Sequence, residues 1–121
     1  MLQLKIKTID IPLFGHQVNL ISGEYNTTIA YLCNSYNIDV GDLDMENNKA
    51  EAITFPIKGD IYIWWEKDID IPTLTHELIH ATYFIMESRG LLLEDHEVWA
   101  YLMQYLMEES MDLAIEFINN G

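Results

Sequence analysis

The feature that most constrains this chain is the segment Thr75–His80, which carries two histidines four residues apart and a glutamate directly after the first. On an α-helix, residues i and i+4 lie on one face, so the Nε2 atoms of His76 and His80 can converge on one cation. Glu77 lies about 100° farther round the helix, which suits it to reach water beside that cation. The HExxH spacing therefore predicts a helix with a metal-binding face.

The residues around this motif have the period of a helix that packs one side on a core. An apolar stripe at helical spacing is formed by Leu74, Leu78, Ala81 and Ile85. Asp70 and Pro72 are typical of a helix start, and Gly90 is typical of a position just after a helix end. We predict a helix from about 72 to 88, with the histidines on the side away from the stripe.

The first part of the chain predicts a strand, an uncertain segment and a helix. Residues 2–9 alternate apolar and polar side chains, which is typical of a strand. Residues 18–21 fit either a short strand or a loop. A helix is predicted over 27–37, with Asn26 as its N-cap. The acidic segment 39–51 is predicted to be a loop.

Two runs rich in Ile, Tyr and Trp flank the segment Lys58–Asp60 and predict a β-hairpin. Pro56 cannot donate a backbone hydrogen bond, so its strand is expected at an edge or at a bulge. We also expect strand 61–65 to lie at an edge, where a substrate peptide would add as a further strand. Because side chains alternate along a strand, we expect one of Trp64 and Trp65 in the core and the other facing outward.

A second long helix is expected from about Glu94, with a break near Ser110. With 121 residues, the chain has the length of a single domain, spanning 1–121. The predicted fold class is α+β: an antiparallel or mixed sheet, the HExxH helix and a following C-terminal helix.

The charge of the chain disfavours two classes of partner, and its cysteine content excludes an internal disulfide. The formal net charge is −14, from 20 acidic and six basic residues, which disfavours binding to nucleic acid and to anionic membrane surfaces. Cys33 is the only cysteine, so no internal disulfide is possible, and we expect it to pack. No signal peptide or run of 18 apolar residues is present. A soluble, cytoplasmic protein is the expectation.

A catalytic zinc site needs a third protein ligand and one open position. Candidates for that ligand gather about 20 residues after the motif: Glu94, Asp95, His96 and Glu97. Here the chain resembles the HExxH zinc metallopeptidases (zincins) of the gluzincin type, in which a glutamate on a following helix completes the site. It also resembles short phage and prophage HExxH proteins and the ImmA/IrrE-like metallopeptidases.

In those families the ligand glutamate opens a segment resembling E-x-x-A-x-x-x-x-x-L-M, and this chain matches it with Glu97, Ala100, Leu106 and Met107. The resemblance covers roughly residues 50–107. It implies that His76, His80 and Glu97 bind Zn²⁺ and that Glu77 is the general base.

The chain departs from the ImmA-like pattern at two places. It has Ile79 where a small residue often precedes the second histidine, and Glu108 where a proline often follows the Leu-Met pair. The rival SprT-like pattern would use His96 as the third ligand, followed by Trp99, but the acidic charge argues against its usual action at DNA. The third ligand therefore stays open between Glu97 and its neighbours.

Tyr101 shares a helical face with Glu97, which makes it a candidate to donate a hydrogen bond to a developing oxyanion. A packed aromatic ring is the alternative role for Tyr101. Asp95 or Glu87 is a candidate to accept the second N–H of a ligand histidine.

The predicted function is zinc-dependent hydrolysis of a peptide or protein, with Glu77 acting on metal-activated water. The alternatives are a catalytically silent zincin-fold binding or structural module, for example in a phage or mobile-element assembly, and a hydrolase of nonpeptide substrates. The sequence indicates no oligomeric state.

Overall fold

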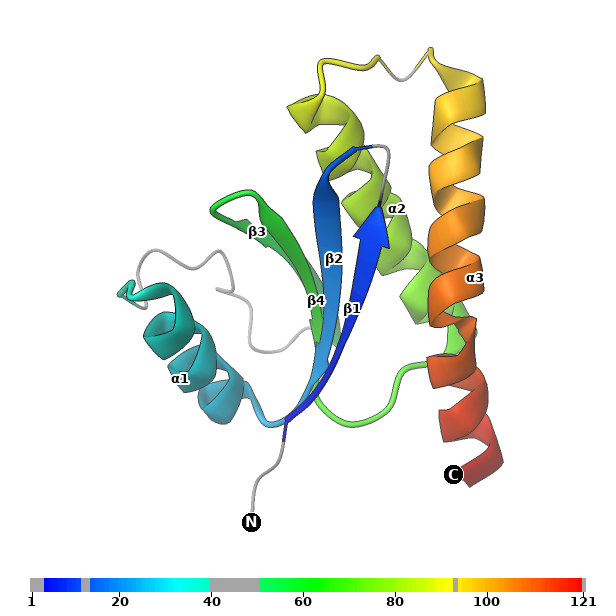
Figure 1. Ribbon diagram of the computed structural model, residues 1–121. Helices are drawn as coiled ribbons and strands as arrows, with labels where there is room; N and C mark the ends of the chain where they lie inside the picture. The colour runs from blue at the N-terminus through cyan, green and yellow to red at the C-terminus, as the bar shows by residue number, and fades with distance from the viewer. Residues whose placement is uncertain (1–3, 12–13, 40–50, 93, 121) are drawn as a thin grey trace.

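The computed structural model describes residues 4–11, 14–39, 51–92 and 94–120, with side chains described as far as Asp112. Over this part of the chain the fold is α+β, with a mixed sheet between helix α1 on one face and helices α2 and α3 on the other (Figure 1). The predicted α+β class is confirmed. Most of the predicted loop 39–51 lies outside the described residues.

Four strands are described, and their order across the sheet is β1-β2-β4-β3. Their bounds are β1 Lys5–Ile11, β2 His16–Ser22, β3 Ala52–Ile57 and β4 Asp60–Trp65. The pairs β1–β2 and β3–β4 are antiparallel, whereas β2 and β4 run parallel, with Val18 opposite Ile61. Residues 18–21 are therefore a strand and not a loop.

The sheet order corrects one prediction about its edges. Strand β4 pairs on both sides, so residues 61–65 are interior and cannot accept an added strand. The two edges of the described sheet are β1 and β3, and β3 carries Pro56, as expected for a residue without an N–H group. The β3–β4 hairpin is confirmed, and its turn residues Lys58 and Gly59 both have positive φ, as in the turns that suit two-residue hairpin loops.

The helices are α1 Tyr25–Tyr36, α2 Ile71–Ser88 and α3 His96–Asn120. The predicted bounds of α2 are confirmed, because the Asp70 side chain accepts from the Thr73 N–H at 2.8 Å and Gly90 follows the helix with φ +69°. The predicted break at Ser110 is wrong. Ser110 is buried within α3, and its hydroxyl donates to the Leu106 carbonyl at 2.6 Å, so the helix accommodates it.

The start of α1 also differs from the prediction. Glu24, and not Asn26, is the N-cap, because its carboxylate accepts from the backbone N–H groups of Asn26 and Thr27. The Thr27 hydroxyl also donates to this carboxylate. Together these hydrogen bonds lower the pKa of Glu24, and the bond from the Thr27 hydroxyl contributes most. The helix therefore begins two residues earlier than its sequence pattern indicates.

Each face of the sheet has its own core. The face toward α2 and α3 buries mainly aliphatic side chains, and the face toward α1 buries Phe55, Tyr62 and Trp64 with Leu32. Because both faces are covered, Trp64 and Trp65 are each 2% exposed, and the expectation that one faces outward is wrong. Cys33 packs against the core on the α1 face, as expected.

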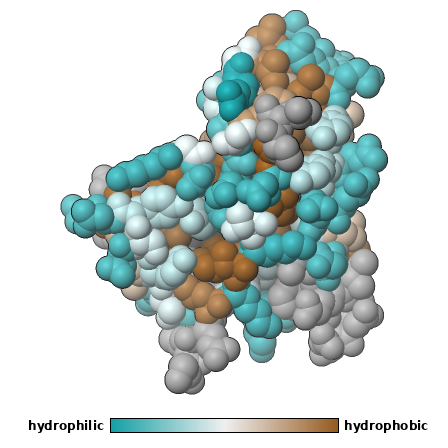
Figure 2. Space-filling model, in the orientation of Figure 1, coloured by the Kyte–Doolittle hydropathy of each residue, from teal (hydrophilic) through white to brown (hydrophobic). Residues whose placement is uncertain are grey.

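The outer surface differs from these cores. In the view of Figure 2, hydrophilic side chains cover much of the visible surface and hydrophobic ones form smaller patches. Within the described part of the chain, no helix combines the length and the apolar character needed to cross a membrane.

Candidate functional site

The two motif histidines lie on α2 with their rings close together. Nε2 of His76 and Nε2 of His80 are 3.2 Å apart. Two nitrogens bound to one zinc ion at about 2.0–2.1 Å and a near-tetrahedral angle would be about 3.3–3.4 Å apart. This spacing therefore suits a single cation. Both residues are exposed, so the pair is open to solvent.

Glu77 differs from its histidine neighbours because it is buried, with 6% exposure. Its Oε1 accepts a hydrogen bond from the hydroxyl of Thr54 on edge strand β3 at 2.6 Å. Its other oxygen, Oε2, lies 3.8 Å from Nε2 of His76. The carboxylate is therefore held between the edge strand and the histidine pair, with one oxygen facing the imidazole.

The packing of α2 explains this orientation. The apolar stripe lies fully buried against the core under α2 and α3, which fixes the rotation of the helix about its axis: Leu74, Leu78, Ala81 and Ile85. With that face turned inward, His76 and His80 point to solvent and Glu77 points to β3. The predicted separation of the histidines from the stripe is confirmed.

Glu97 lies in the first turn of α3 and is exposed. Helices α2 and α3 run antiparallel (Figure 1), and Thr75 contacts Met107 at 3.7 Å between Oγ1 and Sδ. From that contact, Glu97 is about 15 Å along α3, whereas His80 is only about 7.5 Å along α2. Glu97 therefore lies beyond the histidines, toward the C-terminal end of α2.

No group of three His, Cys, Asp or Glu side chains that could hold a metal ion occurs among the residues that the structure describes. His76 lies close to both His80 and Glu77, but the structure does not bring Glu97 to the two histidines to complete a set of three ligands. The role of Glu97 as a ligand stays a prediction.

The other candidates for the third ligand lie at the same end of α3 as Glu97. Asp95 accepts a hydrogen bond from the Leu92 N–H at 2.8 Å, and its carbonyl accepts from the Trp99 N–H at 3.1 Å. Asp95 therefore stabilises the connection that leads into α3. Glu94 and His96 are exposed beside it.

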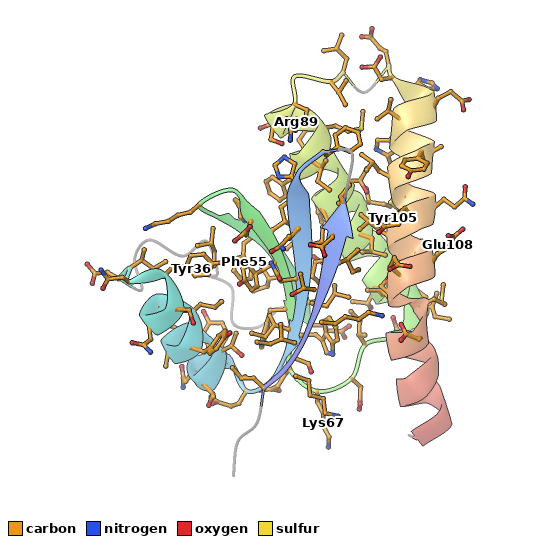
Figure 3. The ribbon with its side chains drawn as sticks, viewed as in Figure 1. Tyr36, Phe55, Lys67, Arg89, Tyr105 and Glu108 are labelled. Atoms are coloured by element: carbon orange, nitrogen blue, oxygen red, sulfur yellow. The ribbon has the colours of Figure 1, made fainter. Side chains whose placement is uncertain are left out.

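Tyr101 is half-exposed and lies against Tyr105, with ring centroids 6.3 Å apart and planes at 12°. The hydroxyl of Tyr105 donates to the carbonyl of Asp10 on β1 at 2.7 Å, which places Tyr105 on the β1 side of α3 (Figure 3). The stack is compatible with the packing role for Tyr101, and its role at an oxyanion stays a prediction.

Thr54 is the residue of this site that sequence reasoning missed. It faces α2 because it follows Ala52, whose side chain belongs to the core under α2, at the strand period of two. The pattern AITFPI shows the alternation, but the partner of its polar position depends on which helix covers the strand. Only the packing of α2 on β3 identifies Glu77 as that partner.

Comparison of the chain with protein-family models, curated protein sequences and solved structures finds no match.

Proposed function

We propose that this protein is a zinc-dependent peptidase whose site is formed by α2 and the edge strand β3. One observation carries the proposal: His76 and His80 present two nitrogens 3.2 Å apart beside the buried carboxylate of Glu77. Two solvated histidines on a helix surface would not need a buried carboxylate next to them. A buried carboxylate costs free energy unless hydrogen bonds compensate for its lost hydration.

The donor set fits two of the ligands of a catalytic zinc ion. His76 and His80 would hold the ion, and Glu97 is proposed as the third protein ligand on the family resemblance alone. Zinc, when bound, supplies a Lewis acid that polarises a carbonyl group and makes water more acidic.

Glu77 is proposed as the general base, and its contacts support this role. Because Oε1 accepts from Thr54, Oε2 is the oxygen on the histidine side, and it is proposed to take a proton from the attacking water. The same oxygen then gives the proton to the leaving amine. Thr54 limits rotation of the carboxylate during both steps, so the proton acceptor stays directed at the histidine face.

The proposed substrate is a peptide in extended conformation that adds to β3. The interior position of β4 excludes it as the docking strand, whereas β3 has one side that pairs with no described strand. Thr54 lies on β3 and contacts Glu77, so a peptide paired with this strand would pass close to the proposed base. Pro56 limits the number of backbone hydrogen bonds near the end of the strand.

The test measures bound zinc and peptide hydrolysis separately. Wild-type protein and the variants His76→Ala, His96→Ala and Glu97→Ala are analysed for metal content, and Glu77→Gln is assayed on a peptide library. We expect His76→Ala and Glu97→Ala to lose zinc, and Glu77→Gln to keep zinc but lose at least about 100-fold in turnover. Glu108→Gln, which changes an exposed glutamate of α3 outside the proposed site, is the control. Unchanged turnover in Glu77→Gln would remove the mechanism.

A catalytically silent zinc-binding module is the second candidate. The observation that favours it is the position of Glu97. Measured along the helices from the contact of Thr75 with Met107, Glu97 lies about 7.5 Å farther than His80. This candidate predicts that purified protein binds one zinc ion and cleaves no peptide in a broad library. Cleavage that depends on Glu77 would exclude it.

A further inference from the structure

A surface pocket of about 370 Å³ lies where α2 ends and the connection to α3 begins. It is lined by Tyr83, Met86, Glu87, Leu91, Leu92 and Glu94. Met86 is buried and forms part of the floor, whereas Tyr83 and Leu92 are 45% and 59% exposed. Large apolar side chains that stay exposed around a pocket are typical of a surface that binds another apolar group.

The pocket is on the same side of α2 as the histidines. At 100° per residue, His76, His80, Tyr83 and Glu87 all lie within an arc of about 60°. Along the helix axis, Tyr83 is about 4.5 Å and Glu87 about 10.5 Å from His80. An extended peptide advances about 3.3 Å per residue, so the pocket is one to three residues away from a bond held at the histidines.

The charged residues around the pocket favour a ligand with positive charge. Glu87 and Glu94 are both exposed, and no lysine or arginine is among the lining residues. The chain as a whole has a net charge of −14, which attracts cations over a longer range. The carboxylates of Glu87 and Glu94 would repel an acidic peptide. They would pair with a lysine or arginine that lies next to an apolar side chain in the peptide.

We propose that this pocket is a specificity subsite that takes a bulky apolar side chain of a basic peptide, one to three residues from the cleaved bond. Met86 and Leu91 contact the apolar side chain, Tyr83 and Leu92 close over it, and Glu87 and Glu94 pair with the neighbouring basic residues. Methionine suits such a site because its flexible side chain adapts to different apolar shapes. The position of this subsite relative to the cleaved bond rests on the proposed peptidase function. The preference of the pocket for an apolar side chain in a basic peptide does not rest on it.

The binding test uses full-length Glu77→Gln protein with added zinc. The substitution removes the proposed general base and so prevents hydrolysis during the measurement. The probe is a fluorescein-labelled nonapeptide with one central leucine flanked by two lysines in an alanine and serine background. Its two relatives replace the leucine by alanine or both lysines by glutamate. We expect each replacement to weaken binding about tenfold in fluorescence anisotropy, because each removes one of the two recognised features. Equal affinity for the three peptides, or no binding up to millimolar protein, overturns the proposal.

Variants connect this preference to the pocket. Leu92→Ser should weaken binding of the leucine peptide about fivefold and leave the alanine peptide unaffected. Its matched control is Ile6→Ser, which removes an exposed apolar side chain of β1 outside the pocket. Glu87→Gln with Glu94→Gln should abolish the preference for lysine, with Glu66→Gln as the exposed control. Equal effects of pocket and control variants overturn the assignment.

Products of the wild-type protein separate this proposal from the peptidase function. Mass spectrometry of cleaved leucine peptide should place the cut one to three residues from the leucine. Cleavage at positions unrelated to the leucine contradicts the subsite while leaving the peptidase in place. The reverse result, leucine-dependent binding without any cleavage, contradicts the peptidase and leaves the pocket as a binding site.

Discussion

The two faces of the sheet are held to their helices in different ways. The face under α2 and α3 is packed mainly by aliphatic side chains, which attract without direction. On the face under α1, Tyr36 donates to Asp60 at 2.9 Å and lies 2.8 Å from the hydroxyl of Tyr62, and the Trp64 indole donates to the Gly23 carbonyl at 2.9 Å. The candidate site is on the aliphatic face.

This difference indicates how each helix is oriented. Directional hydrogen bonds can fix α1, whereas the rotation of α2 depends on the shape of its apolar stripe and on the bond between Thr54 and Glu77. We therefore expect the positions of His76 and His80 to depend on how the apolar stripe of α2 packs on the core. The face under α1 should influence stability without changing metal affinity.

The largest effect is expected from Leu78→Ala compared with Leu32→Ala. Both leucines are fully buried, one under α2 and one under α1, so each substitution should lower the free energy of unfolding by about 2–5 kcal/mol. Only Leu78→Ala should also weaken zinc binding, because it loosens the helix that carries both histidines. Urea denaturation and zinc titration of the folded variants measure the two effects. Equal loss of zinc affinity in Leu32→Ala would contradict the proposed difference between the faces.

Thr54→Val should have the next largest effect. It removes the donor to Glu77 but keeps the shape of the side chain, so the buried carboxylate loses a partner and the free energy of unfolding falls by about 1–3 kcal/mol. Thr54→Ser retains the hydroxyl and should recover most of that loss. Urea denaturation compares the two variants, and identical stabilities would show that the hydrogen bond does not hold Glu77.

Tyr36→Phe tests the directional face and should cost about 1 kcal/mol at neutral pH. Burial, followed by the hydrogen bonds to Tyr62 and Asp60, raises the pKa of Tyr36 in the folded protein. The neutral phenol is favoured by folding, so its contribution is complete below the unfolded pKa of about 10 and is lost as the pH rises toward the folded pKa. Urea denaturation between pH 8 and 11 should show a steeper loss in the wild type than in Tyr36→Phe. Parallel curves would contradict this assignment.

The smallest effect is expected from Asp112→Asn. Lys7 on β1 pairs with Asp112 on α3 at 3.0 Å, and Asp112 is 68% exposed. Exposed ion pairs contribute little, so we expect a change below about 0.5 kcal/mol that disappears at 1 M salt. A change comparable with that of Leu78→Ala would mean that α3 is held by charge and not by aliphatic packing.

Elements with local signals were predictable from the sequence. The bounds of α2 follow from Asp70, Pro72 and Gly90, each of which acts through its own backbone or its immediate neighbours. The β3–β4 hairpin follows from the Lys58-Gly59 turn for the same reason. The position of the histidines on one exposed face needed only the helical period.

What the sequence could not predict depends on contacts between distant segments. The two tryptophans are both buried because α1 covers the second face of the sheet, and the interior place of β4 follows from its pairing with β2. The contact of Thr54 with Glu77 requires α2 to cross β3. The carboxylate of Glu24 accepts from the N–H groups of Asn26 and Thr27, so the helix is already capped before the position at which Asn26 was expected to cap it.

The parallel pairing of β2 with β4 has a consequence for the order in which the protein folds. Its paired residues are 43 positions apart in the chain, as for Val18 and Ile61, so closing this contact carries a larger entropic cost than forming either hairpin. The histidine pair, Glu77 and Thr54 all lie within residues 52–88, on the hairpin and helix that follow the crossover. These parts are close together in the chain, so we expect the site to form before the two halves of the sheet join.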